Sequence, residues 1–107
     1  MTTRLAVVMS GFPRTSETFA VGELVALARA GMLARVYATK PGDGAVPQPG
    51  VAELMPLVRV LPEAGAGVQA GIVAADLARD RVDGLHGYFA HQPAEVAARA
   101  AATLGTG

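Results

Sequence analysis

The sequence contains no cysteine, few aromatic residues and no excess of either charge. Without cysteine, a disulfide, a thiolate metal site and a cysteine nucleophile are all excluded, and a cytoplasmic location is expected. Nine basic residues balance nine acidic ones, and no basic patch stands out. Nucleic acid is therefore not expected as a partner.

Long apolar runs are also missing, although 51% of the 107 residues are hydrophobic and only 17% are charged. The apolar stretch Leu5–Met9 is too short for the apolar region of a signal peptide or for a membrane span. We expect a strand there that is buried on both faces. The composition as a whole predicts one small folded domain, built largely from small apolar side chains.

Strand-like and helix-like segments alternate along the chain. The predicted strands are Leu5–Met9, Leu33–Thr39, Leu57–Leu61 and Leu85–Phe89; the predicted helices are Glu17–Ala30, Val68–Arg81, a single turn at Val51–Met55 and a last helix from Pro93 to its cap at Gly105, with a loop at Lys40–Gly50. In the helix from Val68, the side chains of Val68, Ile72, Ala75 and Leu77 are expected to face inward. The alternation predicts an α/β fold: a Rossmann-like open parallel sheet of about four strands with helices on both faces.

A polar, punctuated run, Gly11–Phe19, follows the first predicted strand. One interpretation is purely structural, with a turn at Pro13 and a helix capped by Ser16. The other is functional, because the turn that leaves a strand's carboxyl end lies in the ligand crevice of an open α/β sheet. Free backbone N–H groups there can bind an oxygen-rich ligand, and Ser16, Glu17 and Thr18 suit sugar hydroxyls. The run lacks the Gly-Lys-Ser/Thr of a P-loop.

Two further features have a weaker claim to a ligand. Gly65–Gly71 has the spacing GxGxxxG, one residue too long for the dinucleotide fingerprint, and is better explained as a glycine-rich helix entry. His86 falls inside the fourth strand and is expected to be partly buried. His91 precedes Pro93 on the crevice side and is a candidate ligand contact. The histidine spacing makes a poor metal site, and no metal is predicted.

Two segments resemble family 4 of the retaining glycosyltransferases, which have the GT-B fold. Phe12–Phe19, with Glu23-Leu24 and Gly31, is similar to the family's FP-x-x-SETF…E…L…G stretch. Leu85–Ala94, with Val96-Ala97 and Leu104-Gly105, resembles its LHAHFA-x-x-PA-x-VA…LG stretch, and Tyr88 stands where the family usually has a second histidine.

The resemblance implies the N-terminal, acceptor-side domain of an enzyme that transfers a sugar from a nucleotide-sugar to a glycan or other acceptor, as in polysaccharide biosynthesis. The candidate substrate-binding residues are Gly11, Phe12, Pro13, Ser16, Glu17, Thr18 and His91. Residues 1–107 are then one partial Rossmann-like domain of a truncated chain, without the donor domain and its E-x7-E motif, and so with no catalytic residue and no activity alone. No cofactor is implied beyond the nucleotide-sugar co-substrate.

The same resemblance implies peripheral membrane association for a full-length enzyme. An unpaired edge of the shortened sheet is expected to promote self-association. The alternative interpretation is a stand-alone Rossmann-like or flavodoxin-like module that binds a small ligand without catalysis, because many functions share this fold.

Overall fold

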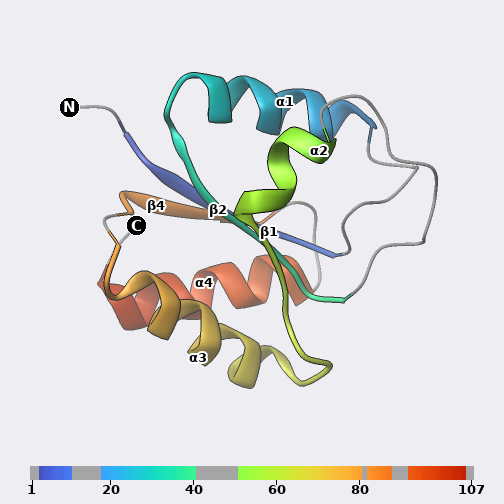
Figure 1. Cartoon of the computed structure of the whole chain (residues 1–107). Coiled ribbons are helices and arrows are strands. Elements are labelled where there is room, and N and C mark those ends of the chain that lie inside the picture. Colours follow the sequence, from blue (N-terminus) through green and yellow to red (C-terminus); the bar gives the residue numbers. More distant parts are fainter. Residues whose placement is uncertain (1–2, 11–17, 41–50, 81, 88–91, 106–107) are drawn as a thin grey trace.

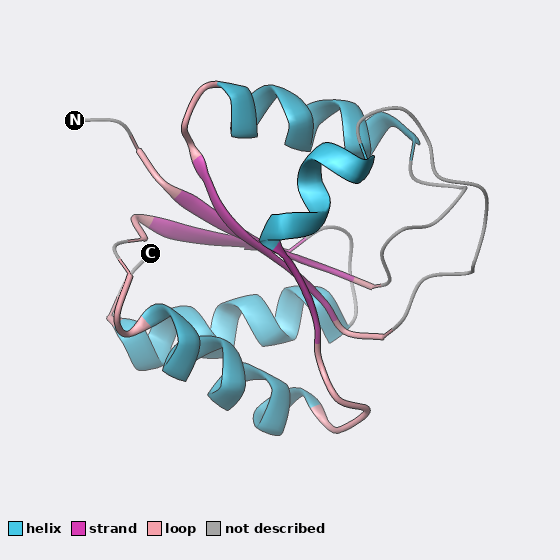
Figure 2. Ribbon diagram, viewed as in Figure 1, coloured by secondary structure: helices cyan, strands magenta, loops and turns pink. Residues whose placement is uncertain are grey.

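A computed structural model describes residues 3–10, 18–40, 51–80, 82–87 and 92–105 of the chain, with only the backbone for residues 18–20 and 51. In chain order the elements are β1 (Leu5–Met9), α1 (Thr18–Arg29), β2 (Leu33–Ala38), α2 (Val51–Leu54), the 3-10 helix η2 (Met55–Leu57), β3 (Val58–Val60), α3 (Ala66–Leu77), β4 (Gly84–Gly87) and α4 (Gln92–Leu104). The four strands form one parallel sheet in the order β3-β2-β1-β4 (Figure 2).

The helices cover both faces of this sheet. Helices α1 and α2 lie on one face, and α3 and α4 pack side by side on the other (Figure 1). Each face has its own hydrophobic cluster, and the sheet separates the two. The α/β class, the parallel sheet and the helices on both faces are therefore confirmed.

Strand β1 lies at the centre of the sheet and is buried on both faces, as predicted. Val7 and Met9 pack into the cluster under α1 and α2, whereas Ala6 and Val8 pack against α3 and α4. All four side chains are at most 1% exposed. A strand with no solvent-facing side has no use for polar residues, which explains its continuous apolar sequence.

Helices α1 and α4, the first and last of the chain, are each amphipathic and are each followed by a glycine. Val21 and Leu24 of α1 are buried, and Gly31 ends that helix with a left-handed φ of 74°. The buried side of α4 consists of Val96, Ala97, Ala100 and Ala101, and Gly105 follows the helix with a φ of 72°. On its exposed side, Glu95 and Arg99, four residues apart, form an ion pair at 2.7 Å.

The predicted inward face of α3 is confirmed at Leu77, with Ile72 half-buried, but is wrong at Val68 and Ala75. Val68 is 60% exposed and Ala75 is exposed, while the buried side consists of Gln69, Ala70, Val73, Ala74 and Leu77. Helix α3 is apolar on nearly every side, so its sequence periodicity does not determine which side faces the sheet. The helix turns the glutamine inward because that amide meets buried backbone carbonyls at the end of the sheet.

Among the described helices, none combines the length and apolar character that crossing a lipid bilayer requires.

Candidate functional site

The strand order creates a switch point between β1 and β4. From β1 the chain enters α1 on one face of the sheet, and from β4 it enters α4 on the opposite face (Figure 1). These two strands are parallel neighbours, paired from Leu5 with Gly84 to Val8 with Gly87. In open α/β sheets, ligands bind outside the carboxyl ends of the strands at such a switch point.

Of the predicted substrate-binding residues, six lie outside the described residues: Gly11, Phe12, Pro13, Ser16, Glu17 and His91. Tyr88 and residues 41–50 of the predicted loop Lys40–Gly50 also lie outside them. Thr18 is the first residue of α1. The described residues closest in sequence to the two candidate segments are Ser10, which follows β1, and Gln92, which begins α4. The described polar residues at the carboxyl ends of the strands therefore define the chemistry of the candidate site.

Thr39 ties the end of β2 to the end of β1. Its backbone N–H donates to the carbonyl of Met9 at 2.8 Å, which extends the parallel ladder by one bond. Its hydroxyl donates to the carbonyl of Ser10, also at 2.8 Å, and the residue is only 8% exposed. A β-branched residue with a hydroxyl suits this position, because it continues the strand and also satisfies a carbonyl beyond the ladder.

Gln69 extends this connection to the third strand. Its side chain is fully buried, and its Nε2 donates to the carbonyls of Thr39 and Pro62, each at 2.9 Å. Both N–H groups of the amide are thus used on backbone carbonyls that follow β2 and β3. A buried carbonyl without a donor costs about 1–3 kcal/mol, so a glutamine here replaces a penalty with two hydrogen bonds.

Gln92 connects the same network to the start of α4. Its Nε2 donates to Gln69 Oε1 at 2.6 Å and to the carbonyl of Ala64 at 3.0 Å. We call Ser10, Thr39, Gln69 and Gln92 the amide network. It joins the ends of β1, β2 and β3 to the N-terminus of α4 without using a charged side chain.

Close packing also brings α4 against the end of β4. A Cβ on Gly87 would lie 2.7 Å from the Cα of Ala94 and 2.9 Å from the carbonyl oxygen of Pro93. Real side chains do not approach a backbone so closely, so this contact requires glycine. The N-terminus of α4 is consequently placed directly at the switch point.

A second polar group lies on the α3 side of the sheet. Tyr37 is fully buried, and its hydroxyl donates to Asp76 Oδ2 of α3 at 3.2 Å. Asp76 Oδ1 accepts from Arg59 of β3. Burial of the phenol and the adjacent Asp76 carboxylate raise the pKa of Tyr37, so the Tyr37 hydroxyl stays protonated and neutral at physiological pH.

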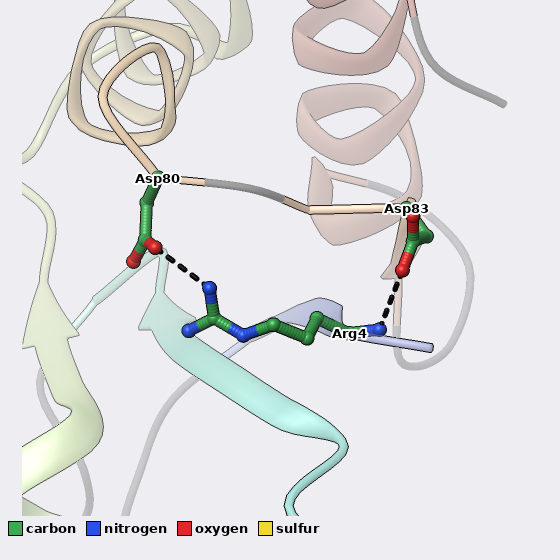
Figure 3. A network of polar contacts seen from close by, with 3 residues as sticks. All are labelled: Arg4, Asp80 and Asp83. Carbon is green, nitrogen blue, oxygen red and sulfur yellow. Dashed lines mark hydrogen bonds and ion pairs between the residues drawn. The ribbon is translucent and has the colours of Figure 1, made fainter. Parts of the chain in front are cut away.

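The opposite end of the sheet is held by charge. The Arg4 guanidinium donates to Asp80 Oδ1 at 2.7 Å, and the Arg4 backbone N–H donates to Asp83 Oδ2 at 2.8 Å (Figure 3). The Asp83 N–H returns a bond to the Arg4 carbonyl at 2.7 Å. We call these three residues the Arg4 cluster; it joins the start of β1 to the connection between α3 and β4.

Sequence reasoning missed the central member of the amide network. The sequence pattern puts Gln69 in a glycine-rich helix entry and predicts that its neighbour Val68 faces inward. A single polar residue in an apolar helix was the available signal, but nothing in the sequence shows that the carbonyls of Thr39 and Pro62 are within its reach. His86, expected to be partly buried, is exposed.

Within the described part of the chain, no group of three His, Cys, Asp or Glu side chains comes close enough to hold a metal ion.

Comparison with family models, with curated proteins and with solved structures gives no match for this chain.

Proposed function

We propose that this chain supplies the acceptor-side domain of a two-domain, GT-B-type glycosyltransferase related to family 4. The observation that supports this most is the adjacency of β1 and β4. The two segments that resemble the family are far apart in the sequence, yet one begins after β1 and the other includes β4. In this proposal both segments contribute to one ligand site at the switch point.

The chemistry of the carboxyl edge suits a neutral ligand rich in hydroxyl groups. The donors of the described amide network are used within it, and the carboxamide oxygen of Gln92 remains as a neutral acceptor that a sugar hydroxyl can use. We propose that Gly11–Thr18 and His91 contact the acceptor sugar or the donor phosphates. A second domain would bind most of the nucleotide-sugar, so residues 1–107 are not expected to transfer sugar alone.

The proposal includes a cytoplasmic location, which the absence of cysteine supports. It also includes self-association through β4. Among the described strands, β4 pairs only with β1, whereas the other outer strand, β3, has a proline just before and just after it, Pro56 and Pro62. A proline has no backbone N–H to donate, so prolines hinder the pairing of a further strand at a sheet edge. Strand β4 contains no proline. Sedimentation velocity over a concentration series should show dimers; a single monomeric species at all concentrations would refute this part.

Ligand binding tests the proposal directly. The chain should be titrated by calorimetry and by thermal shift with UDP-glucose, GDP-mannose and maltotriose, and in parallel with NAD and FMN. We expect at least one sugar-containing probe to bind and to raise the melting temperature. Stabilisation by NAD or FMN, with no response to the sugar-containing probes, would instead support a stand-alone binding module.

A further inference from the structure

Both side-chain N–H groups of Gln92 donate hydrogen bonds, and this fixes the plane of its carboxamide. One N–H of the carboxamide is bonded to Gln69 Oε1 and the other to the carbonyl of Ala64. A carboxamide is planar, so two directed bonds from its nitrogen leave little freedom to rotate. Among the described residues, none donates a hydrogen bond to Gln92 Oε1 in return.

Gln92 is also at the right place for a ligand contact. It is the first residue of α4, it is only partly buried, and α4 begins directly against the end of β4. Gln92 therefore places a carboxamide held by two hydrogen bonds at the switch point, where the strand order predicts a ligand.

We infer that Gln92 Oε1 accepts a hydrogen bond from a ligand hydroxyl or N–H group at the switch point, and that Gln69 is the positioning residue that orients it. The ligand class comes from the proposed function: a polyhydroxylated ligand such as a sugar can donate a hydrogen bond to this oxygen. The acceptor role rests on the proposed function, while the positioning role rests on the contacts of Gln69 alone.

The positioning role of Gln69 comes from its three bonds. Burial at 0% exposure excludes water as a replacement partner, and the two donated bonds fix the amide so that Oε1 faces Gln92. An apolar residue of similar length would fill the space, but it would release Gln92 to rotate and leave the Thr39 carbonyl without its donor.

The test uses three variants of the whole chain. Gln69→Met removes the positioning amide, Gln92→Met removes the acceptor, and Val73→Ala is the matched control. Val73 lies on the same helix and is equally buried, but it contributes only apolar packing. The control therefore lowers stability without touching the amide network.

Hydrogen exchange followed by NMR measures the positioning. In Gln69→Met, the side-chain amide protons of Gln92 should exchange at least tenfold faster, relative to the Val7 amide at the centre of the sheet, because one of them loses its acceptor, Gln69 Oε1. In Val73→Ala all these rates should change in proportion. Proportional changes in Gln69→Met as well would overturn the positioning role.

Affinity for UDP-glucose and for maltotriose measures the acceptor. Gln92→Met and Gln69→Met should each weaken binding of the responding probe about 3- to 10-fold, as expected for one net hydrogen bond, and Val73→Ala should change it less than twofold. Unchanged affinity in Gln92→Met would overturn the acceptor role. If the wild-type chain binds neither probe, the acceptor role and the sugar ligand both fail, and the exchange rates still decide the role of Gln69.

Discussion

The two ends of the sheet are held together by different chemistry. At the amino end, the Arg4 cluster uses an ion pair between side chains that are 33% and 34% exposed. At the carboxyl end, the amide network uses neutral groups around a glutamine that is 0% exposed. Both arrangements connect neighbouring strands to an adjoining segment of the chain, but they do so in very different dielectric surroundings.

This difference indicates that side chains at the carboxyl end are held more rigidly than those at the amino end. Exposed ion pairs contribute about 0–1 kcal/mol, because water and salt screen the charges and long side chains lose entropy. Buried hydrogen bonds between neutral groups are hard to replace, since water cannot reach the orphaned partner. The amide network around the buried Gln69 thus fixes the carboxyl end without a charged side chain, whereas the Arg4 cluster connects the amino end through a partly exposed ion pair.

The largest effect is expected at Gly87, at the carboxyl end. Gly87→Ala places a methyl group 2.7 Å from the Ala94 Cα, so β4 and α4 must separate. We expect a loss of about 2–3 kcal/mol in the free energy of unfolding, measured with urea. Gly71→Ala is the control, because a Cβ at that exposed helical site meets nothing within 4 Å. Gly71→Ala should raise the free energy of unfolding by about 0.5–1 kcal/mol. Equal stabilities for the two variants would contradict the close contact at the switch point.

A middle-sized effect is expected at Tyr37, which combines a buried group with a charged partner. Tyr37→Phe removes the hydroxyl that donates to Asp76, and this should cost about 1 kcal/mol at neutral pH. Because the folded pKa is raised, the contribution of Tyr37 is fully present below the ordinary tyrosine pKa of about 10 and is lost as the pH rises above it.

The difference in unfolding free energy between wild type and Tyr37→Phe should therefore be constant from pH 7 to 9 and shrink above about pH 10. Urea titrations at each pH measure it. A difference that stays constant up to pH 11 would show that the phenol is not protected from ionisation.

The smallest effect is expected at the amino end. Arg4→Met should cost about 0.5 kcal/mol in low salt, and the cost should fall further in 1 M NaCl, because the ion pair with Asp80 is partly exposed. Arg29→Met removes a more exposed ion pair with Glu53 and is the control, with an equal or smaller cost. The contrast between the two ends would be contradicted if Arg4→Met lowered the free energy of unfolding more than Gly87→Ala does, and by the same amount at low and high salt.

The sequence is enough to predict most of the fold, because its signals are local. A continuous apolar stretch identifies β1, and glycines mark the ends of α1 and α4. The regular stripe of α4 also fixes its buried face. Helix α3 lacks such a signal, because its own residues are small and apolar on almost every side. Its orientation is therefore determined by tertiary contacts.

The candidate site was less predictable for a related reason. The switch point follows from strand order, and the sequence predicts parallel strands but does not by itself place β4 beside β1. Gln69 reaches the carbonyl of Thr39 across 30 positions of the chain, and Gln92 reaches Gln69 across 23. Contacts of that separation leave no periodic trace in a sequence.

The most direct test of the central claim is to map where a ligand binds. Backbone amide shifts of the ¹⁵N-labelled chain should be recorded during titration with UDP-glucose and with maltotriose. We predict that the shifts concentrate at the carboxyl end, at Ser10, Thr39 and Gln92, while Arg4 and Asp83 at the amino end do not move. Shifts centred on Arg4 and Asp83, with the amide network unaffected, would contradict the assignment of the carboxyl edge as the functional site.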